Sequence, residues 1–203
     1  LTTAARDARE RGDTESAVRF LRRALIEAAS FPERPHAVLE LGLLEVARLD
    51  PAAEVHLTEA LAAVTAPSER AAAGKALGIA LMFARRGDET IALLERLHAE
   101  LAPLDREAAL TVLGGLANLG QYVIATQRRV SPHVRCLRAM DLRGETSTER
   151  TALGTLAIQA AMDGEPVAIV GDLARRGPQG SGDEARVAES VGEWSPHRRG
   201  VVG

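Results

Sequence analysis

The chain has 203 residues, 46% of them hydrophobic and only 2% aromatic, with a formal net charge of -3. That length suits one ordinary domain or about five 36-residue repeats. The scarcity of aromatic residues argues against a β-sandwich and against a surface that stacks nucleic-acid bases. The balanced charge gives no global basic field that would attract DNA or a membrane. Ala, Leu, Glu and Arg dominate, and because these are strong helix formers we expect an all-α protein.

The single cysteine, Cys136, excludes an internal disulfide framework and favours a reduced, cytoplasmic setting. No run of about 18 apolar residues predicts a membrane-spanning helix, and no charged-then-apolar leader is present. Because the sequence begins with Leu1 rather than Met, we expect a fragment of a longer protein or a trimmed chain.

The first 29 residues predict two helices separated by a break at Arg11-Gly12-Asp13. Gly12 relaxes the backbone there, and Asp13 can cap the helix that follows. In that second helix Ala17 and Ala24 belong to one face at helical spacing.

Residues 31–35 predict a linker, with Pro35 in the first turn of the next helix, where its missing N–H is not needed. Asp50-Pro51 predicts the end of that helix and the start of its partner. The inward-facing residues expected in this pair are Val38, Leu41, Leu44, Leu49, Val55, Leu57, Ala60, Leu61 and Val64.

Residues 65–68 repeat the linker pattern, with Ser68 as the expected cap of a third pair that turns at residues 85–88. Gly74 and Gly78 form a smooth stripe in its first helix. Because a helical glycine is less stable than Ala by roughly 0.5–1 kcal/mol, two of them four residues apart predict a close helix–helix approach. The expected inward-facing residues are Leu77, Leu81, Ala84, Ile91, Leu94, Leu97 and Leu101.

The last third of the sequence is less regular. Pro103-Leu104-Asp105 starts a helix that we expect to break at Leu119-Gly120, before a partner helix over 121–130 that Pro132 ends. An extra short helix is expected over 133–142, then a polar loop over 144–148. The last pair is expected at 151–162 and 167–175, and a low-complexity, disordered tail over 177–203. Ala109, Leu113, Leu116 and Ala117 should face inward in the first of these helices.

Two kinds of dipeptide recur every 36 residues. The acid-Arg pairs are Glu33-Arg34, Glu69-Arg70 and Asp105-Arg106, and the Leu-Gly pairs are Leu41-Gly42, Leu77-Gly78 and Leu113-Gly114. In the last unit the two landmarks come 44 and 40 residues on, as Glu149-Arg150 and Leu153-Gly154, so the register there stays open. A period in the mid-thirties with two helices per unit predicts a helical solenoid, and the alternative is a compact bundle with a chance periodicity.

The Leu-Gly pair, a turn such as Gly12-Asp13, and the small residues Ala17 and Ala24 resemble the tetratricopeptide repeat. Arg85 stands where that pattern expects a turn glycine, while Thr90 and Leu97 replace small residues. The resemblance implies antiparallel helix hairpins stacked as a right-handed superhelix over residues 1–176. The expected units are about 2–31, 32–66, 67–102, an irregular 103–143, and 144–176.

A closer resemblance is to the helical-repeat middle region of large ATP-binding LuxR-type regulators of actinobacteria. The phrases ARERGDTESAVRFLRRAL, LELGLLEVARLDPAAEVHLTEAL, ALGIALMFARRGDETIALLERL and ERTALGTLAIQAAMDGEP carry it, over roughly residues 4–176. The resemblance implies a non-catalytic module that senses a protein or small-molecule effector and acts on the ATPase and DNA-binding domains of the parent chain. A free-standing adaptor for a protein or peptide is the first alternative, and an enzyme with a site between helices is the second.

Few residues suggest chemistry of their own, and no cofactor is expected. Gly74-Lys75 lacks the other residues of a phosphate-binding loop, and the five histidines lack the spacing of zinc ligands. No Ser-His-Asp or Cys-His order has supporting context, which predicts a protein that is not an enzyme. An arginine-rich stretch could contact an acidic partner or phosphate, although a specific nucleic-acid role needs a wider basic surface. Its members are Arg128, Arg129, Arg135, Arg138 and Arg143, with Asp141 the one acid among them.

Overall fold

The computed structural model describes residues 1–27, 31–122 and 126–178. Within these ranges the chain forms ten α-helices. The bounds are α1 Thr2–Glu10, α2 Thr14–Glu27, α3 Arg34–Ala47, α4 Ala53–Ala63, α5 Pro67–Phe83, α6 Gly87–Leu101, α7 Arg106–Tyr122, α8 Gln127–Ala139, α9 Ser147–Met162 and α10 Val167–Arg176. The prediction of an all-α protein is confirmed, and nearly all of the expected tail lies outside the described residues.

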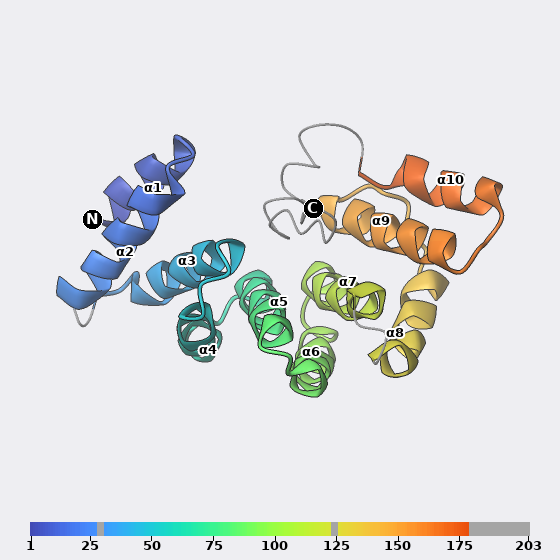
Figure 1. Ribbon diagram of the computed structural model, residues 1–203, viewed down its shortest axis with the longest axis horizontal. Helices are drawn as coiled ribbons and strands as arrows, with labels where there is room; N and C mark the ends of the chain where they lie inside the picture. The colour runs from blue at the N-terminus through green and yellow to red at the C-terminus, as the bar shows by residue number, and fades with distance from the viewer. Residues whose placement is uncertain (28–30, 123–125, 179–203) are drawn as a thin grey trace, which may run out of the picture.

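Consecutive helices pack as antiparallel pairs, and the pairs follow one another along an arc (Figure 1). The first helices of successive pairs also contact each other, α3 with α5, α5 with α7 and α7 with α9. We call these four helices the inner row, because they lie on the hollow side of the arc while α4, α6 and α8 lie behind them.

Each described turn within a pair contains one residue in the left-handed region, followed by a backbone hydrogen bond that closes the helix end. The Asp50 N–H donates to the Glu45 carbonyl, and the Arg86 N–H donates to the Leu81 carbonyl. Such a bond satisfies one carbonyl that the helix end leaves free. The left-handed residues are Gly12 (φ +74°), Leu49 (φ +57°), Arg85 (φ +61°) and Gly164 (φ +72°). The break predicted at Gly12 is therefore confirmed, and Leu49 and Arg85 adopt the same conformation without being glycine.

The recurring Leu-Gly pairs lie inside the inner row. Leu41, Leu77 and Leu113 are all buried, as are Ala17 and Ala24 of α2. A Cβ added to Gly42 would lie 2.7 Å from Leu57 Cδ2, and one added to Gly78 would lie 3.3 Å from Thr90 Cγ2. Nothing lies within 4 Å of the corresponding point at Gly114. Two of the three glycines thus permit the close approach of a partner helix, whereas Gly114 does not serve that purpose.

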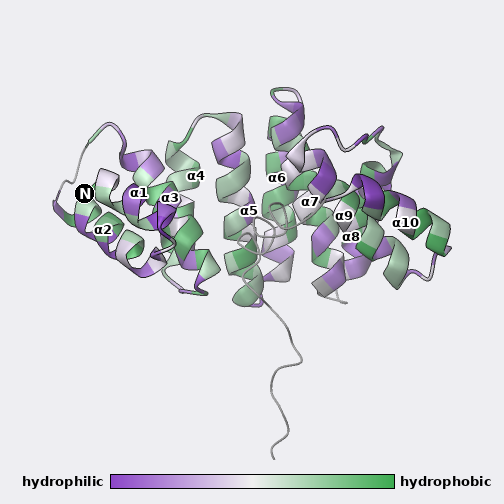
Figure 2. Cartoon of the chain, turned by 90° about the horizontal axis from the view of Figure 1, so that it is seen from above, coloured by the Kyte–Doolittle hydropathy of each residue, from purple (hydrophilic) through white to green (hydrophobic). Residues whose placement is uncertain are grey.

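The apolar core is divided into four clusters that follow the chain. One joins α1 and α2 to α3, the next joins α3 and α4 to α5, a third joins α5, α6, α7 and α8, and the last joins α7 to α8, α9 and α10. Hydrophobic residues accordingly run through every helix, interspersed with hydrophilic ones (Figure 2). Apolar contacts therefore connect each pair to its neighbours.

The recurring acid-Arg pairs hold ion pairs between helices. Arg34 donates to Glu59 over 2.8 Å and Arg70 donates to Glu100 over 2.7 Å, each tying the start of a first helix to the end of its partner. Glu69 lies 2.9 Å from His36 of the preceding first helix. Both arginines thus link helices within a pair, and Glu69 also links its pair to the previous one.

Helix α8 corrects the prediction for residues 119–142. Gly120 does not break α7, which continues to Tyr122, and Pro132 lies inside α8 rather than ending a helix. A Cβ at Gly120 would lie 2.6 Å from Val130 Cγ2, so this glycine is required by packing against α8 rather than by a turn. Pro132 removes a single backbone donor, a loss that the buried contacts of Val130 and Leu137 offset.

Three smaller expectations were also wrong. Helix α5 starts at Pro67, and its N-cap residue is Ala66, whose side chain makes no capping hydrogen bond. Ser68 therefore lies within the helix and does not cap it. Helix α9 starts at Ser147 and not at residue 151, so part of the expected polar loop is helical. The Thr146 hydroxyl caps this earlier start by accepting from the Glu149 N–H. Leu49, Val55 and Ala84 are exposed rather than inward-facing.

Candidate interaction surface

Acidic side chains compensate part of the positive charge of the arginine-rich stretch. All five arginines are exposed, but three have acidic partners: Arg129 donates to Asp88, Arg138 to Glu165, and Arg143 to Asp141. The hydrogen bonds to these acids raise the pKa of Arg138 and of Arg143. Only Arg128 and Arg135 of the five have no ion pair with another described residue.

The described histidines make polar contacts with residues of other helices. His98 Nδ1 lies 3.1 Å from the Ala109 carbonyl oxygen, and His133 Nε2 lies 3.0 Å from Glu95 Oε1. Within residues 1–27, 31–122 and 126–178, no three His, Cys, Asp or Glu side chains gather as a metal site would require. His197 lies outside these ranges. No described helix combines the length and apolarity needed to cross a bilayer.

Helices α5, α7 and α9 of the inner row each carry a row of partly exposed side chains. Each of these helices packs on a partner behind it and on neighbours beside it, so no other described helix covers the hollow side of the arc. On α5, α7 and α9 the partly exposed positions recur at helical spacing, and Gln121 Nε2 donates to the Thr155 carbonyl across the α7–α9 boundary. These positions are Ala72, Lys75 and Ile79; Thr111, Gly114, Gly115 and Asn118; and Thr151, Gly154 and Thr155.

Lys75 is the chain's only lysine and lies at the boundary between α5 and α7. Its Cγ would lie 3.6 Å from a Cβ placed on Gly115, so the aliphatic stem runs over a glycine of α7. Burial lowers the pKa of the Lys75 ammonium below its usual 10.5. In the described part of the chain no acidic side chain pairs with it. Its position in the middle of α5 also excludes the phosphate-binding loop that Gly74-Lys75 could have suggested.

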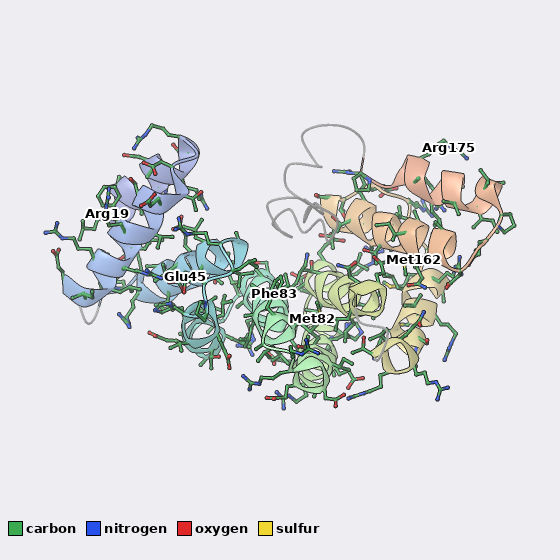
Figure 3. All side chains as sticks on the ribbon, in the orientation of Figure 1. Arg19, Glu45, Met82, Phe83, Met162 and Arg175 are labelled. Atoms are coloured by element: carbon green, nitrogen blue, oxygen red, sulfur yellow. The ribbon has the colours of Figure 1, made fainter. Side chains whose placement is uncertain are left out.

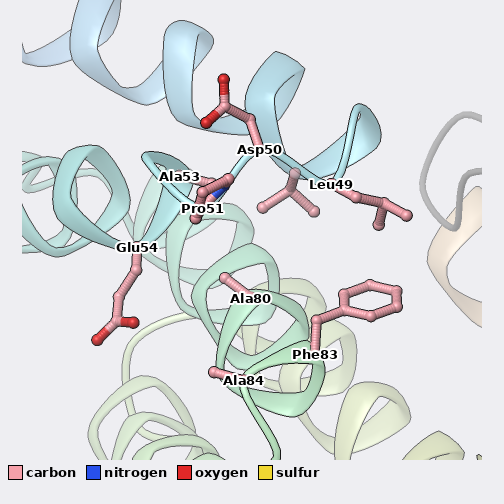
Figure 4. A pocket seen from close by; sticks show the side chains of 9 residues that line it. Leu49, Asp50, Pro51, Ala53, Glu54, Ala80, Phe83 and Ala84 are labelled. Atoms are coloured by element: carbon pink, nitrogen blue, oxygen red, sulfur yellow. The ribbon is translucent and has the colours of Figure 1, made fainter.

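A cavity of about 250 Å³ lies between the α3–α4 turn and the end of α5 (Figure 4). Two large apolar side chains stand at its mouth, Leu49 at 57% exposure and Phe83 at 50%. We call it the Leu49–Phe83 pocket. The remaining lining residues are Val46, Asp50, Pro51, Ala53, Glu54, Ala80 and Ala84.

Both acidic residues that line the pocket are already paired with arginines. Asp50 accepts from Arg22 over 2.7 Å and also from the Ala52 N–H, and these bonds lower its pKa, the backbone bond most. Glu54 accepts from Arg86, whose pKa is raised by Glu89 and Glu54. The pocket therefore offers apolar surface without a free charge.

A buried carboxylate fixes the turn that carries Leu49. Glu45, labelled on α3 in Figure 3, has a fully buried side chain. Arg22 donates to its Oε1 over 2.7 Å, and His56 Nδ1 lies 2.6 Å from its Oε2. Arg22 bonds Asp50 as well, and the two acids raise the pKa of Arg22. One guanidinium thus joins α2, α3 and the α3–α4 turn.

Sequence reasoning missed this pocket. Leu49 was expected inside the core because it continues the apolar spacing of α3, whereas the helix ends two residues before it. The signal that could have found the site is the large residue at a turn position that Gly12 and Gly164 occupy in other pairs. Neither a family model nor a curated protein nor a solved structure matches this chain.

Proposed function

We propose that the chain is a non-catalytic helical-repeat module whose pairs stack as an α-solenoid and bind a partner along the inner row. One observation carries this proposal: α3, α5, α7 and α9 contact one another in order, and α5, α7 and α9 each carry a row of partly exposed residues in which Lys75 bears the one charge. The arginines of the outer helix α8, in contrast, pair with acids on α6 and on the α9–α10 turn. An extended surface of this kind suits recognition of a segment or of an effector.

The phrases that resemble LuxR-type regulators place this module, in our proposal, between an ATPase domain and a DNA-binding domain. Binding at the inner row would change the small rotations between pairs and so alter the positions of the two ends. The division of the core into neighbouring clusters supports this idea, because each step between pairs can adjust on its own.

The coding sequence on both sides of this chain tests the regulator proposal. We expect a phosphate-binding loop motif upstream and a helix-turn-helix downstream in the same reading frame. Stop codons on both sides would contradict the regulator assignment and favour a free-standing adaptor.

A further inference from the structure

We propose that the Leu49–Phe83 pocket binds a large apolar side chain of a partner segment, and that Lys75 binds a carboxylate of the same segment. This inference rests on the proposed function, since it assigns chemistry to the partner of the inner row. The occupant is therefore a short acidic segment with one apolar anchor residue.

The apolar half of the proposal rests on how Leu49 is presented. Its backbone is left-handed, a conformation that favours glycine, yet its side chain stays mostly in solvent and gains little from the core. Phe83 is half exposed on the facing element (Figure 4). The network around Glu45 holds this turn in place, so the pocket exists before anything binds. Exposed apolar walls around a formed pocket are typical of a binding site.

The acidic half rests on charge complementarity. The carboxylates of the pocket, Asp50 and Glu54, already have arginine partners, so a charged anchor would gain nothing there. Lys75, in contrast, holds an ammonium in a partly buried position on the same helix as Phe83, with no acid from the described residues beside it. A carboxylate from outside would supply the missing countercharge.

The spacing between the two sites limits the occupant. Lys75 and Phe83 are eight residues apart on α5, which corresponds to about 12 Å along the helix axis. An extended segment covers a similar distance in about four residues. The acid and the apolar anchor should accordingly be separated by three intervening residues.

Two pentapeptides test the proposal directly, Ac-Glu-Ala-Ala-Ala-Phe-NH₂ and its reversed sequence. Each is titrated into the full chain labelled with ¹⁵N, and amide shifts are followed by NMR. We expect at least one to bind saturably, with shifts centred on residues 49, 75 and 83. Replacing its Phe by Ala should weaken binding about tenfold, and replacing its Glu by Gln about threefold.

Protein variants separate the two halves. Phe83→Ala should weaken the Phe-containing peptide about tenfold, and with Lys75→Gln the Glu and Gln peptides should bind equally. Leu49→Gly removes a wall of the pocket and suits the left-handed backbone, so it should reduce binding without unfolding the chain. Leu104→Ala is the matched control, because Leu104 is an exposed apolar residue away from the pocket.

Either of two results would overturn the inference: no saturable shift for either peptide at 2 mM, or binding that Phe83→Ala and Lys75→Gln leave unchanged. Both outcomes are independent of the coding sequence around the chain. If neither peptide binds but the flanking coding sequence contains the two expected domains, this inference fails while the regulator proposal stands.

Discussion

At the scale of single residues, equivalent repeat positions differ in what surrounds them. Gly42 and Gly114 both follow a buried leucine of the inner row, but only Gly42 has a partner side chain where a Cβ would lie. Substitution by alanine should consequently have opposite effects at the two positions.

We expect Gly42→Ala to lower the free energy of unfolding by about 1–3 kcal/mol, because the new methyl group overpacks against Leu57. Gly114→Ala should raise it by about 0.5–1 kcal/mol, because alanine favours the helix and nothing obstructs its methyl group. Urea unfolding of both variants measures the difference. Equal effects of the two substitutions would show that packing against Leu57 is not the reason why position 42 requires glycine.

Lys75 gives a second prediction at this scale. Its pKa is lowered by burial, so between the folded value and 10.5 the unfolded chain binds more protons than the folded one. Stability should therefore rise with pH in that window, relative to Lys75→Met. Because there is one lysine, selective ¹³C-lysine labelling gives one Cε signal whose titration reports this pKa. A midpoint at or above 10.5 would show that the ammonium is fully solvated.

At the scale of elements, Glu149 connects the start of α9 to α7. It is nearly buried, where its Oε2 accepts from the N–H groups of Arg143, Gly144 and Glu145, and its Oε1 accepts from Arg106 over 2.8 Å. The hydrogen bond from Arg106 lowers the pKa of Glu149 most, and those from the Glu145 and Arg143 N–H groups lower it further. This carboxylate helps to join the last pair to the irregular unit, where α8 makes few contacts with α9.

Glu149→Gln should lower the free energy of unfolding at pH 7 by about 1.5–3 kcal/mol, since charge-assisted hydrogen bonds to buried donors are lost. The folded pKa is lowered, so the stabilisation is complete above the unfolded value near 4.5 and disappears as pH falls through the folded value. Unfolding of both proteins at pH 7, 5 and 3 should show their difference shrinking. A difference that persists undiminished at pH 3 would contradict the assignment to the ionised carboxylate.

Helices with regular spacing could be predicted from the sequence, and the irregular unit could not. The prolines of the linkers and the Leu-Gly pairs located α3 to α7 to within a few residues, because apolar periodicity and helix-start chemistry agree there. At Pro132 the low helix propensity of proline predicts a break, but α8 continues through it because Val130 and Leu137 on either side are buried. The Leu49–Phe83 pocket escaped prediction for a similar reason, since exposure of Leu49 depends on where α3 ends.

At the scale of the whole molecule, the buried apolar residues form four clusters along the chain, and the helices of the inner row contact one another in order. Residues 67–102 form one complete pair, α5 and α6, whose neighbours on both sides present inner-row helices with the same direction. If stability is mostly nearest-neighbour, α3 and α4 can pack on α7 once that pair is absent.

Deletion of residues 67–102 tests this central claim most directly, with far-UV circular dichroism followed through a urea titration. The account predicts that the shortened chain keeps the helical signal of the remaining pairs and unfolds cooperatively at a lower urea concentration than the full chain. Collapse to random coil without denaturant would contradict it, because that result requires one indivisible core.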